Sequence, residues 1–414
     1  MFRKNWGQMV AALTRILGTG RLDQAEALVQ EAFVSALSSW AFSGVPENPV
    51  AWLITTAKNK ALDQIKHDKI HTNKSDDMRK QLEDWAKPTQ KGASETTLKT
   101  EVGDDLLRMM YVCCFPELSS EVQVALILKN LCGLSLKEIA RGFLQKDKTI
   151  EQRLTRARML LREKNPAFEI PSPSEIKDRT ATVFDALYLL FNEGYAATEG
   201  DLVIRRDLCS DAINYLDLIL AHPTASCPEG QALQGLFCLQ ASRFAARFDS
   251  AGDLVIMEDQ DRTAWDMDLL RKGLWHLNQA MSAQSLSVFH IEAGIAAEYA
   301  TAPSFPETNW RQIVNYYDLL SALKNNPIVA LNRAVALAHQ EFYEKSNTTA
   351  GLSTLYALEN KDELKHYHLL YAAIATLERR RGHDTVAKTY FEKALGCVKT
   401  GPEKLFLMKR LREM

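Results

Sequence analysis

Long apolar runs are missing from this sequence of 414 residues. No stretch reaches the ~18 consecutive apolar residues of a transmembrane helix. The first segment, MFRKNWGQMVAALTRIL, lacks the small-residue cleavage site of a signal peptide. We therefore expect a cytoplasmic protein with no membrane partner.

Paired cysteines are also missing, because the seven cysteines are an odd number and form no CxxC motif. This pattern argues against a disulfide framework and against a zinc ribbon, so no metal is expected. We interpret the adjacent Cys113 and Cys114 as two buried thiols on a helix rather than as a redox pair.

Alternating strand patterns are scarce, whereas apolar residues recur at helical spacing almost everywhere, which predicts an all-α fold. The length suggests two to four domains. We predict a helical domain over 1–70, a polar flexible linker over 71–103, a second domain over 104–165 and a helical extension over 175–414. Three prolines within 165–174 separate the last two, so a cut after Phe168 is expected to leave both halves folded.

Positive charge is concentrated in one segment, residues 141–164. Eight basic residues and three acidic ones lie across 141–164, whereas the residues after 164 include 25 basic and 32 acidic ones. A basic segment inside a mildly acidic protein is typical of a site that meets phosphates in one place only.

The basic segment reads as a helix-turn-helix. Ser135 and Glu138 have capping-box spacing, and a turn over Leu144–Asp147 precedes a second helix that begins near Thr149. Its buried stripe is predicted to be Ile150, Leu154, Ala157 and Leu161. The residues that this stripe leaves for base edges and phosphates are Lys148, Thr149, Gln152, Arg153, Thr155, Arg156 and Arg158. The alternative is a basic face that is merely solvated.

Two segments of the first domain contain further candidate binding residues. In DQAEALVQEAFVSALSSW, Asp23 and Glu26 have capping-box spacing, and an apolar face leaves Gln30 and Glu31 on the other side. In SGVPENPVAWLITTAKNKALDQIKHDK, a Pro-rich loop leads into a helix with Trp52 near its start and several lysines along it. Lysines suit a phosphate backbone, and a loop beside an aromatic ring suits an unpaired base, although Trp52 is also a candidate for the core.

These segments resemble regions 2.2, 2.3, 2.4 and 4 of RNA polymerase sigma factors of the extracytoplasmic-function type. The resemblance implies promoter-specific transcription initiation, with promoter DNA and the β′ clamp and β flap of the polymerase core as partners. It implies polymerase contacts at Glu26, Gln30 and Glu31, and −35 contacts at the seven residues from Lys148 to Arg158 named above. It implies −10 contacts at Asn48, Trp52, Lys58, Asn59, Asp63 and Lys66.

The extension resembles that of a sigma-factor subgroup through FNEGYAAT (191–198) and MEDQDRTAWD (257–266). It also contains an internal repeat near 330–400. Ala338, Ala350 and Ala357 recur 37 residues later as Ala375, Ala387 and Ala394, a pattern typical of tetratricopeptide-like hairpins. Gly382 and Phe391 fit the second copy, whereas the first copy lacks the turn glycine and has Thr354 in place of the aromatic residue.

Other functions remain open. Glu258, Asp259 and Asp261, with His366 and His368, are candidates for a metal-dependent enzyme, or the carboxylates cap a turn. Because no catalytic motif completes a site, we expect no enzyme, no catalytic residue and no cofactor. A helix-turn-helix regulator whose extension binds protein or senses a ligand is a further alternative, as is a repeat scaffold. We expect the extension to dock on the sigma domains or on polymerase rather than to cover the basic helix.

Overall fold

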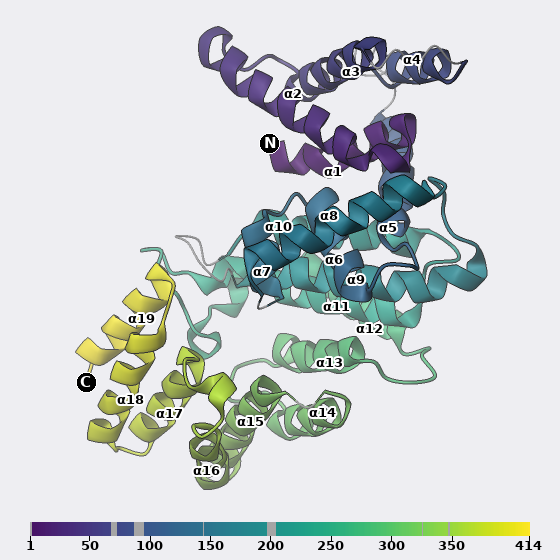
Figure 1. Cartoon of the computed structure of the whole chain (residues 1–414). Coiled ribbons are helices and arrows are strands. Elements are labelled where there is room, and N and C mark those ends of the chain that lie inside the picture. The colour runs from purple at the N-terminus through teal and green to yellow at the C-terminus, as the bar shows by residue number, and fades with distance from the viewer. Residues whose placement is uncertain are drawn as a thin grey trace. The chain divides into compact units, whose positions relative to one another are not determined.

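The computed structural model describes residues 2–67, 73–86, 95–143, 145–196, 204–324, 326–346 and 348–414. These residues are mainly helical and contain no named strand; one isolated bridge pairs Phe248 with Leu254. The fold is all-α, as predicted (Figure 1). The chain forms two compact units, Met1–Leu190 with Asn214–Ala225, and Phe191–Ile213 with Ser226–Met414.

Unit 1 contains the helices before residue 165 and parts of the first two helices of the extension. Its helices are α1 (Phe2–Leu17), α2 (Leu22–Ser43), α3 (Pro49–His67), α4 (Asn73–Ala86), α5 (Glu95–Cys113), α6 (Ser120–Asn130), α7 (Leu136–Gly142), α8 (Asp147–Lys164), most of α9 (Pro173–Tyr195) and the second half of α10 (Arg206–Ala221). A 3-10 turn at Thr19–Arg21 precedes α2.

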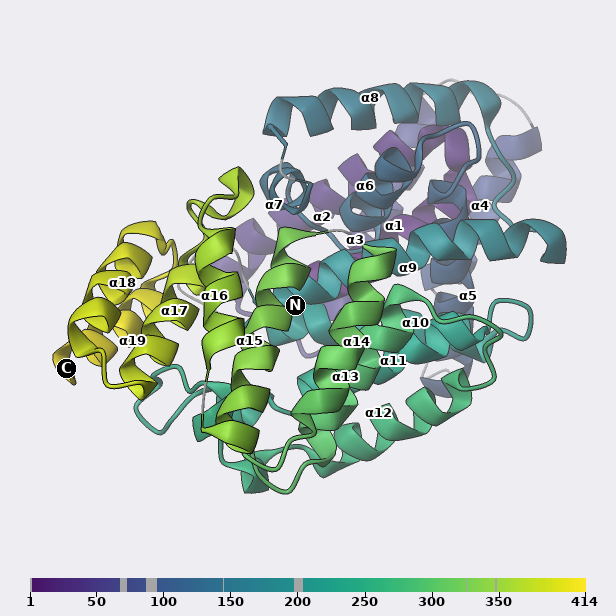
Figure 2. The same cartoon turned by 90° about the horizontal axis from the view of Figure 1, so that it is seen from below.

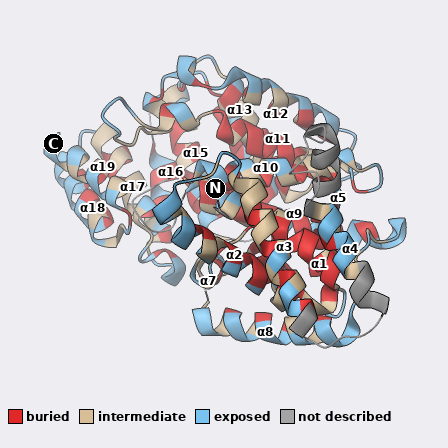
Figure 3. Ribbon diagram, turned by 90° about the horizontal axis from the view of Figure 1, so that it is seen from above, coloured by how far each residue is buried: buried red, intermediate tan, exposed pale blue. Residues whose placement is uncertain are grey.

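The core of unit 1 is built from apolar faces of α1, α5, α6 and α9, and Figure 3 shows buried residues along α1 and α9. Cys113 and Cys114 belong to this core and are fully buried, as the sequence predicted. Burial raises the pKa of the Cys113 thiol to about 12. A thiol that stays protonated is a poor nucleophile, so the pair is structural.

The linker predicted over 71–103 contains helix in its described part. α4 occupies Asn73–Ala86 and buries Leu82 completely, and α5 begins at Glu95. Met78 and Trp85, at helical spacing from Leu82, are half-buried, so three apolar residues on a mostly polar helix anchor α4, and composition alone misses such a pattern. Residues 71–72 and 87–94 of the predicted linker lie outside the described residues.

The start of the extension belongs to the same compact unit as the first 165 residues. α9 buries Val183, Phe184 and Leu187. The buried hydroxyls of Tyr111 on α5 and Thr180 on α9 lie 2.9 Å apart, and Tyr215 of α10 donates to the carbonyl of Leu131 at 3.0 Å. A cut after Phe168 would strip these helices from unit 1, so this packing argues against the expectation of two folded halves.

Unit 2 holds the rest of the extension. Its helices are the end of α9, the start of α10, α11 (Pro228–Ala241), α12 (Met267–Ala280), α13 (Val288–Thr301), α14 (Trp310–Leu323), α15 (Pro327–Lys345), α16 (Thr349–Leu358), α17 (His368–Arg380), α18 (Asp384–Cys397) and α19 (Gly401–Arg412). Short 3-10 turns occupy Phe244–Arg247, Met257–Asp259, Arg262–Ala264 and Asp362–Leu364. Figure 2 shows α13, α14 and α15 running side by side.

The predicted repeat corresponds to two helical hairpins, α15–α16 and α17–α18, but the predicted register is wrong in α16, the second helix of the first hairpin. Ala375, Ala387, Phe391 and Ala394 are buried as expected. Ala350 and Ala357 are exposed, because the first copy is offset by 36 residues there instead of 37. Gly351 takes the place of Ala387, and an added Cβ on it would lie 2.6 Å from the Cβ of Ala338.

The same offset explains the turn and the aromatic position of the first hairpin. Gly382 has a φ of 80°, and Ser346, 36 residues earlier, also adopts a positive φ of 52°. Leu355, fully buried, occupies the position of Phe391. The first hairpin therefore satisfies the same packing rules with different residue types.

The bond between α5 and α9 gives a test of whether the extension stabilises unit 1. We expect Thr180→Val to lower the local stability of α5 and α9 by about 1–3 kcal/mol, because it deprives the buried Tyr111 hydroxyl of this bond. Adding Tyr111→Phe should restore part of the loss, since both polar groups are then replaced. Hydrogen exchange of peptides from both helices measures this. Unchanged exchange in the single variant would contradict the packing.

Candidate nucleic-acid interface

The helix-turn-helix begins with a complete capping box. Ser135 Oγ accepts from the Glu138 amide at 3.2 Å, and the Glu138 carboxylate accepts from the Ser135 amide at 2.7 Å. α7 is therefore held at its start as predicted. α8 begins at Asp147, two residues before the predicted start, and Asp147 places a negative charge in the first turn, where the helix dipole favours it.

α8 is amphipathic in the predicted register. Ile150, Leu154, Ala157 and Leu161 are all buried, with at most 2% exposure. The opposite face presents Lys148, Gln152, Thr155 and Arg156, which are exposed, and Figure 3 shows this helix pale blue along much of its length. The buried stripe fixes the rotation of the helix, so these four side chains project together away from unit 1.

The flanks of α8 are occupied by ion pairs within unit 1. Arg153 contacts Glu121 of α6 at 2.6 Å, and Arg158 contacts Glu26 of α2 at 2.6 Å. The last turn adds two more pairs, Arg162 with Asp23 at 3.3 Å and Lys164 with Glu117 at 3.2 Å. The DNA contacts predicted for Arg153 and Arg158 therefore require these carboxylates to be exchanged for phosphates.

Glu26 lies buried against α8. Its side chain is only 8% exposed, and burial raises its pKa although the Arg158 guanidinium opposes that shift. The capping box predicted with Asp23 does not form, because α2 begins at Leu22 and Arg21 occupies the N-cap. Glu26 is turned into the contact with α8, so it is not available to an external partner while the pair is formed.

A second contact holds the end of α8 against the start of α2. Asn165, in the left-handed conformation after α8, accepts from the Gly20 amide at 2.9 Å, and Thr19 Oγ1 donates to the Pro166 carbonyl at 2.5 Å. A side chain on Gly20 would crowd Asn165 Oδ1 at 3.0 Å. The positions of the two helices are thus linked by backbone groups as well as by charge.

The outer side of α2 is exposed and partly apolar. Gln30 and Glu31 are exposed, and Glu31 pairs with Lys60 of α3 at 3.1 Å. Val34 and Leu37, which follow Gln30 at helical spacing, are 62% and 61% exposed. The exposure of these two side chains was not predicted, because apolar residues on a helix resemble core residues until the structure shows which face is covered. Exposed apolar side chains beside polar ones are typical of a protein-binding surface.

The residues predicted for −10 recognition lie around the start and length of α3. Asn48 Oδ1 accepts from the Ala51 amide at 3.0 Å, which stabilises the first turn. Trp52 packs edge-on against Trp40 with ring centroids 5.5 Å apart, so its ring is partly structural. Asn59 and Asp63 are exposed, and Lys58 is half-buried. The side chain of Lys66 lies outside the described residues. Phe42, just before the loop, is 95% exposed.

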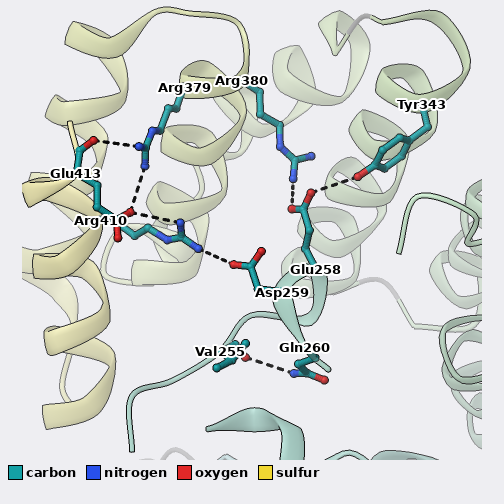
Figure 4. Close-up of polar contacts among 9 residues, drawn as sticks. All are labelled: Val255, Glu258, Asp259, Gln260, Tyr343, Arg379, Arg380, Arg410 and Glu413. Carbon is teal, nitrogen blue, oxygen red and sulfur yellow. Dashed lines mark hydrogen bonds and ion pairs between the residues drawn. The ribbon is translucent and has the colours of Figure 1, made fainter. Parts of the chain in front are cut away.

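The carboxylates of the MEDQDR segment do not gather as a metal site. Glu258 pairs with Arg380 of α17, and Asp259 pairs with Arg410 of α19 at 2.9 Å (Figure 4). Asp261 caps a turn by accepting from the Thr263 amide at 2.9 Å. His366 is exposed, and His368 lies 3.4 Å from Glu403. In the described part of the chain no three His, Cys, Asp or Glu side chains are arranged for a metal ion.

No described helix is long and apolar enough to cross a membrane.

Comparison with known proteins accounts for three parts of the chain. Residues 1–69 match Sigma-70 region 2, residues 108–161 match Sigma-70 region 4, and residues 179–281 match a family of unknown function, DUF6596. An uncharacterized protein of Rhizobium meliloti (strain 1021) is 33% identical over 405 residues, which cover 98% of this chain and 92% of that protein. No solved structure matches the chain. The chain therefore belongs to the sigma-70 family, as an RNA polymerase sigma factor of the extracytoplasmic-function type with a helical C-terminal extension.

Proposed function

We propose that this sigma factor acts in the cytoplasm, binds the RNA polymerase core through the outer side of α2, and directs it to promoters through α3 and α8. Sigma factors are not enzymes, so the polymerase performs the chemistry. The observation that carries the proposal is the free face of α8, where residue types suited to bases project together from a helix of fixed rotation.

On the −35 side, Arg156 and Gln152 are suited to guanine and adenine edges, and Lys148, Thr149 and Thr155 to bases or phosphates. Arg153 and Arg158 then serve phosphates after leaving their carboxylate partners. On the −10 side, the loop before α3 receives an unpaired base, and Asn48, Trp52, Lys58, Asn59, Asp63 and Lys66 line the path of the opened strand.

For polymerase, the proposed contact surface on α2 is Gln30, Glu31, Val34 and Leu37. The β′ clamp is the proposed partner of this surface, and the β flap is the proposed partner of the helix-turn-helix region. Glu26 is left out of the surface because it is buried against Arg158.

For the extension, the structure favours a supporting role over that of a lid. The carboxylates that pair with Arg153 and Arg158 come from α6 and α2, not from the acidic extension. Meanwhile α9 and α10 contribute to the core of unit 1. We infer that the extension stabilises the promoter-reading domain and adds a surface for a further protein partner.

A helix-turn-helix regulator that acts without entering polymerase is the second candidate. Gel filtration of the purified chain with RNA polymerase core separates the two, because only a sigma factor coelutes with core. Elution of the chain apart from core would favour the regulator.

The first prediction concerns base recognition. Arg156→Ala should cost about 1–3 kcal/mol at one −35 position and relax the preference there. Arg162→Ala, at the 68% exposed end of α8, should weaken binding to all sequences alike and reduce the salt slope by about one. Holoenzyme binding to −35 variants at several salt concentrations checks both. If the two variants lose affinity equally and without regard to sequence, another face of α8 enters the groove.

The second prediction concerns polymerase docking. Leu37→Asp, or Gln30→Ala with Glu31→Lys, should abolish binding to core without loss of helix content, because these side chains are exposed. Leu319→Asp on α14, where the leucine is 48% exposed, is the matched control and should bind core normally. Core pull-down and circular dichroism give the result. Full binding by a folded Leu37→Asp variant would remove α2 from the interface.

A further inference from the structure

The two motifs that mark the extension meet at a cavity in unit 2. The cavity has a volume of about 280 Å³. Tyr195, from the FNEGY segment, lines it together with Val255, Met257 and Gln260 from the stretch around MEDQDR. The FNEGY and MEDQDR segments, which the proposed transcription function does not use, therefore line the same cavity.

Two arginines form the polar wall of this cavity. Arg247 Nη1 donates to the Tyr195 carbonyl at 2.6 Å, and its guanidinium lies 4.2 Å from the centre of the Tyr195 ring. Arg243 Nη2 donates to the Tyr195 hydroxyl at 2.8 Å, while its Nε is buried without a hydrogen-bond partner. Tyr195 thus orients both guanidinium groups and leaves donors unused.

Neither arginine is in direct ion-pair contact with a carboxylate of the described residues. Burial lowers the pKa of Arg247, and the more distant charge of Glu403 only partly opposes that shift. The acidic residue of the lining, Glu403, is engaged with His368 at 3.4 Å and with Thr400. Both residues are half-buried, and the Arg243 Nε is buried without a partner, so two adjacent guanidinium groups held by a phenol and a carbonyl indicate a place for an external anion.

Apolar side chains line the rest of the cavity, and ion pairs to α17 and α19 hold the segment that contributes part of the lining. Leu254, Leu369 and Phe406 are among these apolar side chains. The segment 255–260 lines one side of the cavity. It is held by the ion pairs of Glu258 with Arg380 and of Asp259 with Arg410, and Gln260 Nε2 donates to the Val255 carbonyl at 3.3 Å (Figure 4). A small cavity with an apolar body and a few oriented donors has the composition of a small-molecule site.

We propose that this cavity binds a small carboxylate with a short apolar body, whose oxygens take donors from Arg243 and Arg247 and whose body lies against Leu369 and Phe406. A planar guanidinium matches a carboxylate in two parallel hydrogen bonds, which suits this chemistry. The site adds ligand sensing to the transcription function and does not depend on it.

The test uses the full chain and sodium hexanoate, with inorganic phosphate as an anion that lacks an apolar body and sodium chloride at equal ionic strength as the baseline. Hexanoate at ten times its dissociation constant should raise the melting temperature of unit 2 by about 3–6 °C, and phosphate should act more weakly. Arg243→Gln and Arg247→Gln should each abolish the shift. Arg271→Gln, an exposed arginine on α12, should keep it.

Equilibrium dialysis of the wild-type chain with labelled hexanoate gives an answer that needs no variant and should show one site per chain. No saturable binding of hexanoate, or an equal shift in the two cavity variants and the wild type, would overturn the proposal. Neither readout involves polymerase or promoter DNA, so its failure would leave the proposed transcription function untouched.

Discussion

The ion pair between Glu26 and Arg158 is the constraint on which the arrangement of unit 1 depends. Both side chains are largely removed from water, and leaving either one alone would bury an uncompensated charge at a cost of several kcal/mol. The pair therefore holds α8 against α2, while the buried stripe of α8 sets the rotation of that helix. The pair engages one residue from each candidate surface and leaves the opposite face of α8 and the outer side of α2 exposed. A partner that separates these helices has to offer new contacts to both charges, as DNA phosphates do for arginine.

The start of the extension belongs to the same compact unit as the part of the chain that matches the sigma regions. The hydroxyl pair of Tyr111 and Thr180 and the bond from Tyr215 to Leu131 tie α9 and α10 into the core of unit 1. The same two helices continue into unit 2, where Tyr195 ends α9 beside the candidate carboxylate site. The residues of α9 are thus divided between the two compact units, with Tyr195 in unit 2.

Local features of this fold were predictable because they depend on residues a few positions apart. The capping box of Ser135 and the buried stripe of α8 follow from spacing alone. The partner of Glu26 is 132 positions away and is not encoded in any local pattern. Val34 and Leu37 look like core residues in a sequence, since apolarity does not say which face is covered. In the first hairpin the repeat offset changes from 37 to 36 residues. Gly351, rather than the predicted Ala350, therefore corresponds to Ala387.

The central claim is that this chain confers promoter-specific initiation on RNA polymerase. Run-off transcription by core polymerase, with and without the chain, on DNA from upstream of its own gene tests that claim most directly. A discrete transcript that requires both the chain and an intact −35 element is the predicted result. Transcription by core that is unchanged on addition of a chain shown to bind it would contradict the account.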